Sequence, residues 1–75
     1  MMSIQAILDE QAIERLPLIA RVIKQAPPFE ANQMRCYALK EINNNTLSLD
    51  EMSPNMLDAF EGYLTTMFSF KGWGV

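Results

Sequence analysis

Prolines divide this chain into short segments and so limit the length of any helix that it can form. The four prolines are Pro17, Pro27, Pro28 and Pro54. A proline inside a helix costs about 3 kcal/mol, because it lacks an amide hydrogen and clashes with the preceding turn, whereas at the first helical position it costs little. At Pro17 the sequence leaves two arrangements open. Either one helix ends near Arg15 and another starts at Pro17, or a single kinked helix runs from about Glu10 to Gln25.

In the N-terminal half, the spacing of apolar residues indicates helices on both sides of Pro17. Ser3 is a suitable N-cap for a first helix. The apolar face of this helix consists of Ile4, Ile7 and Leu8. Ile13 would lie almost opposite Ile4 if the helix continued, so we expect a break near Asp9. After Pro17 a second apolar face consists of Leu18, Ile19, Val22 and Ile23.

In the C-terminal half, the sequence predicts a third helix over about residues 29–42 and a fourth one that starts at Ser53-Pro54. The apolar face of the third helix consists of Ala31, Met34, Ala38, Leu39 and Ile42. Ser48 and Glu51 have the spacing of a capping box, which predicts a single helical turn between the two helices. The fourth helix has the most regular apolar stripe, and we expect its first members to form the centre of the core. These are Met56, Leu57, Phe60 and Leu64.

Together these signals predict an all-α fold, a compact bundle of three to four short helices. We expect a single helical domain over residues 1–75, in which residues 71–75 form a non-helical tail. The chain has one cysteine, Cys36, and no histidine, so it cannot form an internal disulfide or a zinc site of the usual kind. We therefore expect no metal and no cofactor, and stability has to come from packing or from association with another chain.

The residue types argue against an enzyme. Histidine, the commonest general base, is absent. Cys36 has no histidine to activate it, and we expect it to pack as a small apolar residue. The carboxylates all occupy plausible surface positions on the predicted helices. We therefore predict no catalytic residue.

Charge is distributed unevenly along the chain, whose net charge is −3. Residues 41–70 contain no cation and five anions, which are Glu41, Asp50, Glu51, Asp58 and Glu61. This acidic C-terminal half suits a basic protein partner, which it would attract at long range. The same sign opposes binding to phosphates, so a nucleic-acid partner is not expected.

Aromatic residues gather near the C-terminus and indicate a partner-binding surface, because aromatic and methionine side chains are enriched in protein interfaces. The candidate partner-binding residues, two carboxylates included, are Asp58, Glu61, Tyr63, Met67, Phe68, Phe70 and Trp73. Trp73 has an alternative role, in which it folds back and covers the chain's own core.

The sequence thus predicts a small, non-catalytic protein–protein interaction module, acting as an adaptor, inhibitor or regulatory subunit in the cytoplasm. The expected partner is a protein of unidentified kind, or a second copy in a homodimer. We expect no membrane association, because the densest apolar stretch, residues 16–23, is far shorter than the about 20 residues that a spanning helix needs. Two alternatives stay open. One is a small helix-turn-helix-like transcriptional regulator that reads DNA with residues 29–42, and the other is a structural subunit of a large assembly.

Overall fold

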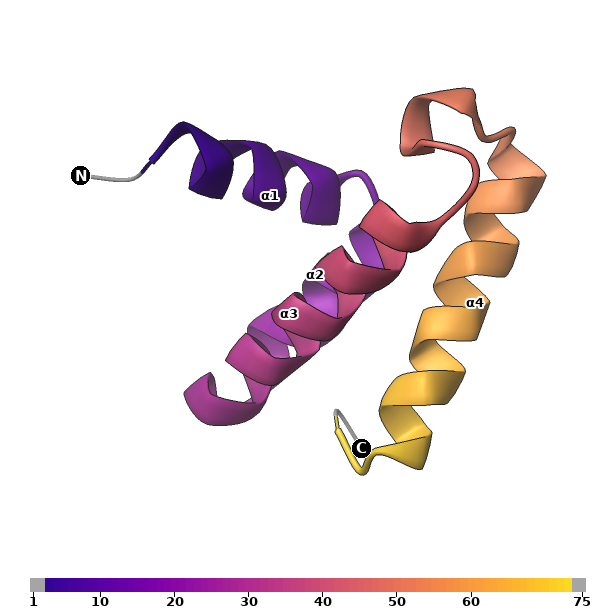
Figure 1. The fold of residues 1–75 in the computed structure, drawn as a ribbon. Coiled ribbons are helices and arrows are strands. Elements are labelled where there is room, and N and C mark those ends of the chain that lie inside the picture. Colours follow the sequence, from indigo (N-terminus) through magenta and orange to yellow (C-terminus); the bar gives the residue numbers. More distant parts are fainter. Residues whose placement is uncertain (1–2, 74–75) are drawn as a thin grey trace.

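Helices account for every regular element of the computed structural model, which describes residues 3–73. In chain order they are α1 (Ile4–Glu14), α2 (Pro17–Gln25), α3 (Pro28–Asn44), the short 3₁₀ helix η1 (Leu49–Glu51) and α4 (Pro54–Phe70) (Figure 1). No strand occurs among the described residues, and the predicted all-α bundle is confirmed. Residues 71–73 follow α4 without helical structure, as predicted, while residues 74 and 75 of the predicted tail lie outside the described range.

The helices begin where local sequence signals place them. The Ser3 hydroxyl accepts a hydrogen bond from the Ala6 amide at 3.1 Å, and the Ser53 hydroxyl accepts one from the Met56 amide at 3.3 Å. Prolines occupy the first turn of α2, α3 and α4. Pro17 therefore starts a helix and does not kink one. The predicted capping box also forms at the start of η1.

The predicted break near Asp9 is wrong, because α1 runs without interruption from Ile4 to Glu14. The Asp9 carboxylate accepts a hydrogen bond from the Gln5 side chain one turn earlier, at 2.8 Å, and so supports the helix instead of capping a new one. Ile13 is buried in the core, whereas Ile4 on the opposite side is exposed. Helix α1 therefore carries apolar residues on two opposite faces, and the chain itself covers one of them.

Helix α2 lies at the centre of the fold and packs against α1, α3 and α4. In Figure 1, α2 and α3 follow the same diagonal, α4 diverges from them, and α1 extends away from α4. The Cα atoms span 33 × 31 × 19 Å. Because a helix with its side chains is about 10–12 Å across, the body is roughly two helices thick. Such a thin body cannot bury all the apolar residues of the chain.

The core differs from the predicted one along α4. Leu64 is fully buried, as predicted, but Leu57 and Phe60 are only half-buried and Met56 is exposed. The inward face of α4 instead centres on Leu64 and Phe68, which lie one turn apart and face α2 and α3. The buried apolar residues of the chain are Ile13, Leu16, Ile19, Ile23, Met34, Ala38, Leu49, Leu64 and Phe68.

Glu61 explains why this face of α4, and not the predicted one, turns inward. Its position also corrects the expectation that every carboxylate lies on the surface. Its side chain is 8% exposed, and its Oε2 accepts hydrogen bonds from the amides of Leu18 at 2.8 Å and Ile19 at 3.2 Å. These are the first free amides of α2, because Pro17 has none and Leu16 at the N-cap cannot accept a hydrogen bond through its side chain. Glu61 thus caps α2 from another helix and turns that side of α4 inward.

We expect Glu61→Ala to lower the free energy of unfolding by about 3 kcal/mol, because the part-buried amide of Leu18 and the buried amide of Ile19 lose a charged acceptor. In a chain of this size, each kcal/mol shifts the melting temperature by roughly 4–8 °C. Asp58→Ala, an exposed carboxylate one turn earlier, is the matched control and should leave the melting temperature almost unchanged. Equal melting temperatures for the two variants, measured by circular dichroism, would show that the cap contributes nothing.

We expect Phe68→Ala to cost about 3–5 kcal/mol, because a buried phenylalanine leaves a cavity that the surrounding side chains fill only in part. Phe60→Ala should cost less, because Phe60 already contacts solvent. Urea denaturation of both variants measures the difference. A larger loss for Phe60→Ala than for Phe68→Ala would contradict the observed orientation of α4.

Candidate functional site

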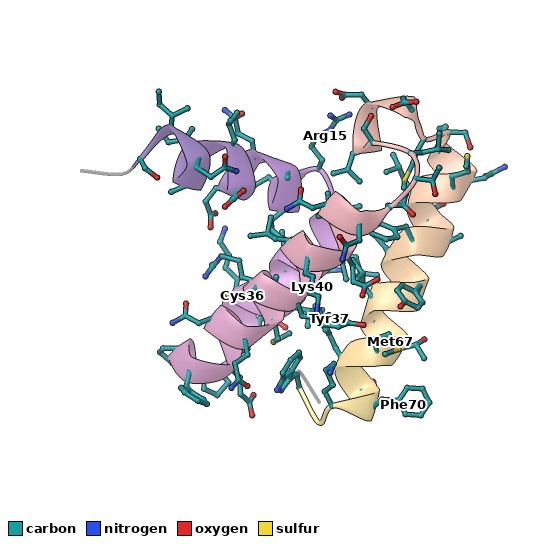
Figure 2. All side chains as sticks on the ribbon, in the orientation of Figure 1. Arg15, Cys36, Tyr37, Lys40, Met67 and Phe70 are labelled. Carbon is teal, nitrogen blue, oxygen red and sulfur yellow. The ribbon has the colours of Figure 1, made fainter. Side chains whose placement is uncertain are left out.

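The structure separates the predicted partner-binding residues into an exposed and a buried group. Asp58, Tyr63 and Phe70 are exposed, and Met67 is half-buried on the same helix. Figure 2 shows Phe70 projecting away from the other helices at the end of α4. Phe68, in contrast, is buried in the core. Glu61 is buried as the cap of α2, so neither of these two side chains is accessible to a partner.

Trp73 folds back onto the chain, in the alternative role that the sequence left open. Gly72 adopts a positive φ of 78°, a conformation that suits glycine and reverses the chain after α4. The Trp73 amide then donates a hydrogen bond to the Phe68 carbonyl at 2.8 Å. The indole packs against the rings of Tyr37 and Phe68, with centroid separations of 6.1 Å to each. Trp73 is half-buried in this position and covers one end of the core.

Tyr37 joins α3 to the end of α4. Its ring meets Phe68 edge-on at 6.2 Å, and the ammonium group of Lys71 lies 4.9 Å from its centroid, within the range of a cation–π interaction. In Figure 2 the Tyr37 side chain reaches from α3 towards α4. Burial raises the pKa of Tyr37 to about 12, with added contributions from the side chain of Tyr63 and from the negative charge of Glu41. The packed rings of Tyr37, Phe68 and Trp73 are therefore part of the folded body of the chain.

A second exposed apolar surface lies on α1, where sequence reasoning placed no binding residue. Ile4, Ile7 and Leu8 are 78%, 45% and 52% exposed. We call these three residues the α1 outer face. The signal for it was present in the sequence, because Ile13 lies opposite Ile4 on a continuous helix. The same spacing predicts a break in the helix near Asp9, but in the structure it marks a continuous helix with two apolar faces.

An open groove of about 320 Å³ continues the α1 outer face towards η1. Its apolar wall consists of Leu8, Ala12, Ile42 and Leu49, and Gln11, Arg15 and Asp50 line the rest. Arg15 and Asp50 form an ion pair that connects the end of α1 to η1. Figure 2 shows Arg15 at this junction. The groove thus offers apolar contact along one side and a charged pair at its end.

Helix α4 presents an apolar row beside its buried face. Met56, Tyr63 and Phe70 are 44%, 46% and 81% exposed, and Phe60 and Met67 between them are half-buried. The rings of Phe60 and Tyr63 stack with their centroids 6.5 Å apart. We call these five residues the α4 seam. It contains three of the predicted partner-binding residues, Tyr63, Met67 and Phe70.

No group of three or more potential metal-ligating side chains occurs among the described residues. Cys36 is exposed on α3, which corrects the expectation that it packs as a small apolar residue. None of the helices in residues 3–73 is long and apolar enough to cross a membrane.

No known protein family, no curated protein and no solved structure matches the chain.

The raised pKa of Tyr37 predicts a loss of stability at high pH. The unfolded chain releases the phenol proton near pH 10, whereas the folded chain holds it until about pH 12. The stabilisation is therefore complete below pH 10 and is lost as the pH rises towards 12. We expect Tyr37→Phe to reduce this pH dependence in thermal melts between pH 9 and 12 and to remove the tyrosinate absorbance step near pH 12. A parallel loss of stability in both proteins would contradict the assignment.

Proposed function

We propose that the chain is a non-catalytic protein–protein interaction module, an adaptor, inhibitor or regulatory subunit that binds a partner protein. The observation that supports this most directly is the α1 outer face with its adjoining groove. Three large apolar side chains lie exposed within two turns of one helix, beside a groove with an apolar wall. Single exposed apolar residues are ordinary, but contiguous ones mark interaction surfaces.

The two opposite apolar faces of α1 strengthen this proposal. A helix that packs against one neighbour needs a single apolar stripe, and a helix that is apolar on more than one side is normally buried on each of them. Ile13 lies on the apolar face of α1 that packs inside the chain. Ile4, Ile7 and Leu8 have no such role in the fold, so burial against a partner accounts for their identity.

Charge indicates the kind of partner. At the groove Arg15 balances the charge of Asp50, and the exposed carboxylates of Glu14 on α1 and Glu51 on η1 lie nearby in the chain. Acidic residues beside an apolar surface favour a partner helix with an apolar stripe and basic flanks, because complementary charges accelerate association. We place this interaction in the cytoplasm, where a chain with one exposed thiol stays reduced.

The absence of catalysis is part of the proposal. Its support is the lack of histidine in the sequence and the position of Glu61, whose carboxylate caps a helix. For the DNA-reading alternative, the discriminating feature is a basic exposed face on α3. Arg35 of this helix lies 3.0 Å from Glu10 in an ion pair, which leaves Lys40 as its exposed cation. No observation therefore favours that alternative.

The test is affinity capture with the tagged chain in cells of its source. We expect Leu8→Glu to remove the captured partner, or to weaken purified partner binding at least tenfold, because the variant places a carboxylate on an apolar contact. Phe29→Gln is the matched control, since Phe29 is exposed at the start of α3, outside the groove. Circular dichroism verifies that both variants fold.

Two results would contradict the proposal. One is capture of the same partner, with unchanged affinity, by Leu8→Glu. The other is an equal loss with Phe29→Gln, which would show that the effect is not specific to the α1 outer face.

A further inference from the structure

Helix α1 is attached to the rest of the fold by fewer buried residues than any other α-helix of the described chain. Ile13 is the one residue of α1 that is buried, whereas α2 and α3 each bury two residues and α4 buries three. In Figure 1 the N-terminal part of α1 extends away from the other helices. Elements with few buried apolar contacts open at a lower free energy than the core of a protein. Helix α1 is therefore the α-helix that the fold holds most weakly.

Empty space flanks α1 on two sides. The open groove of about 320 Å³ separates Leu8 and Ala12 of α1 from η1 and the end of α3. A smaller cavity of about 70 Å³ lies between α1, α2 and α3, where Glu10, Ile13 and Glu14 line the α1 side. Because well-packed interiors contain few voids larger than a water molecule, these two spaces show that α1 is not packed tightly between its neighbours.

Two ion pairs connect α1 to segments that are distant in the sequence. Arg15, directly after α1, pairs with Asp50 on η1, and Glu10 pairs with Arg35 on α3 at 3.0 Å. The four side chains are between 35% and 79% exposed, so solvent weakens both pairs. An exposed ion pair changes an equilibrium constant by a factor of about five at most. For a helix with one buried side chain, such a factor is enough to change how often it opens.

Leu16 provides a fixed point about which α1 can move. It is fully buried, and its carbonyl accepts a hydrogen bond from the amide of Ala20 at 2.9 Å, so it belongs to the start of α2. Pro17 has no amide hydrogen, and the next two amides donate to Glu61. Helix α1 can therefore separate from α2 without breaking a backbone hydrogen bond of α2.

We propose that α1 is a hinged arm that opens as a unit about Leu16 while α2, α3 and α4 stay folded, and that the two ion pairs are its latches. Opening brings Ile13 into solvent and moves the α1 side of the groove away from Ile42 and Leu49. The groove therefore exists only while α1 is docked. The latches then regulate the access of a partner to the groove, a consequence that rests on the function proposed above.

Hydrogen exchange of the full chain, followed by NMR in native buffer without a partner, tests the arm. A helix of 11 residues is marginal in water when it is isolated, so α1 loses its hydrogen bonds when it opens. We expect the amides of residues 8–14, corrected for intrinsic rates, to share one opening equilibrium. They should exchange at least about tenfold faster than the slowest amides of α2, α3 and α4.

Two patterns of exchange would overturn the arm. Equal protection in all four helices would show that α1 opens only when the whole chain unfolds. Protection that rises gradually from residue 8 to residue 14 would show fraying from the N-terminus in place of opening as a unit.

Asp50→Asn tests the latch at η1. This variant should speed exchange in α1 by about two- to fivefold and leave the exchange of α2, α3 and α4 unchanged. Asp58→Asn is the matched control, because it removes the same charge from an exposed residue of α4 and leaves both ion pairs in place. Glu10→Gln tests the second latch, and its effect should multiply that of Asp50→Asn in the double variant. An unchanged α1 in Asp50→Asn, or an equal effect of Asp58→Asn, would overturn the role of the latches.

These measurements need no partner, so the failure of the arm and the failure of the proposed function can be told apart. Uniform exchange in a chain whose partner binding is lost in Leu8→Glu would overturn the arm and support the function. Separate exchange of α1 in a chain whose partner binding survives Leu8→Glu would support the arm and overturn the function.

Discussion

The capping of α2 by Glu61 is the interaction on which the arrangement of the helices depends. Helix α2 starts with Pro17 after Leu16, so its own sequence provides no side chain for the amides of Leu18 and Ile19. The carboxylate that binds them comes from α4, 43 residues further along the chain. Since α2 contacts the other three helices, fixing α4 to the start of α2 also fixes α4 relative to the rest of the body. A buried carboxylate without these two donors would be strongly unfavourable.

This cap has consequences on the opposite side of α4. Because Glu61 points inward, Leu64 and Phe68 follow it into the core, and the row from Met56 to Phe70 lies beside the core with its two ends exposed. The aromatic contacts of Tyr37 and Trp73 then hold the C-terminal end of α4 against α3. The same rotation that satisfies α2 thus produces the α4 seam, and one polar contact links the internal packing of the chain to its surface.

Helix α1 shows a different relation between packing and surface. Its C-terminal half enters the core through Ile13, while its N-terminal half exposes Ile4, Ile7 and Leu8 next to a groove. In a body about two helices thick, a helix at the edge has one side that no other part of the chain can cover. Among the described residues, six of the eight exposed large apolar residues therefore lie on two separate helices, three on α1 and three on α4.

The sequence by itself determined where the helices begin, because proline, serine caps and the capping box act over three or four residues. It also determined the fold class, since apolar residues recur with the period of a helix. It did not determine the end of α1, which runs past Asp9 to Glu14. Only the tertiary structure decided which face of each helix turns inward. Apolar spacing on α4 is compatible with a core centred on Met56 and Phe60, and no local signal distinguishes Glu61 from the exposed Asp58. The free amides of α2 decide which face of α4 turns inward, because they bind the carboxylate of Glu61, a residue far away in the sequence. The position of Trp73 and the two faces of α1 were decided in the same way, because burial depends on what the rest of the chain can reach.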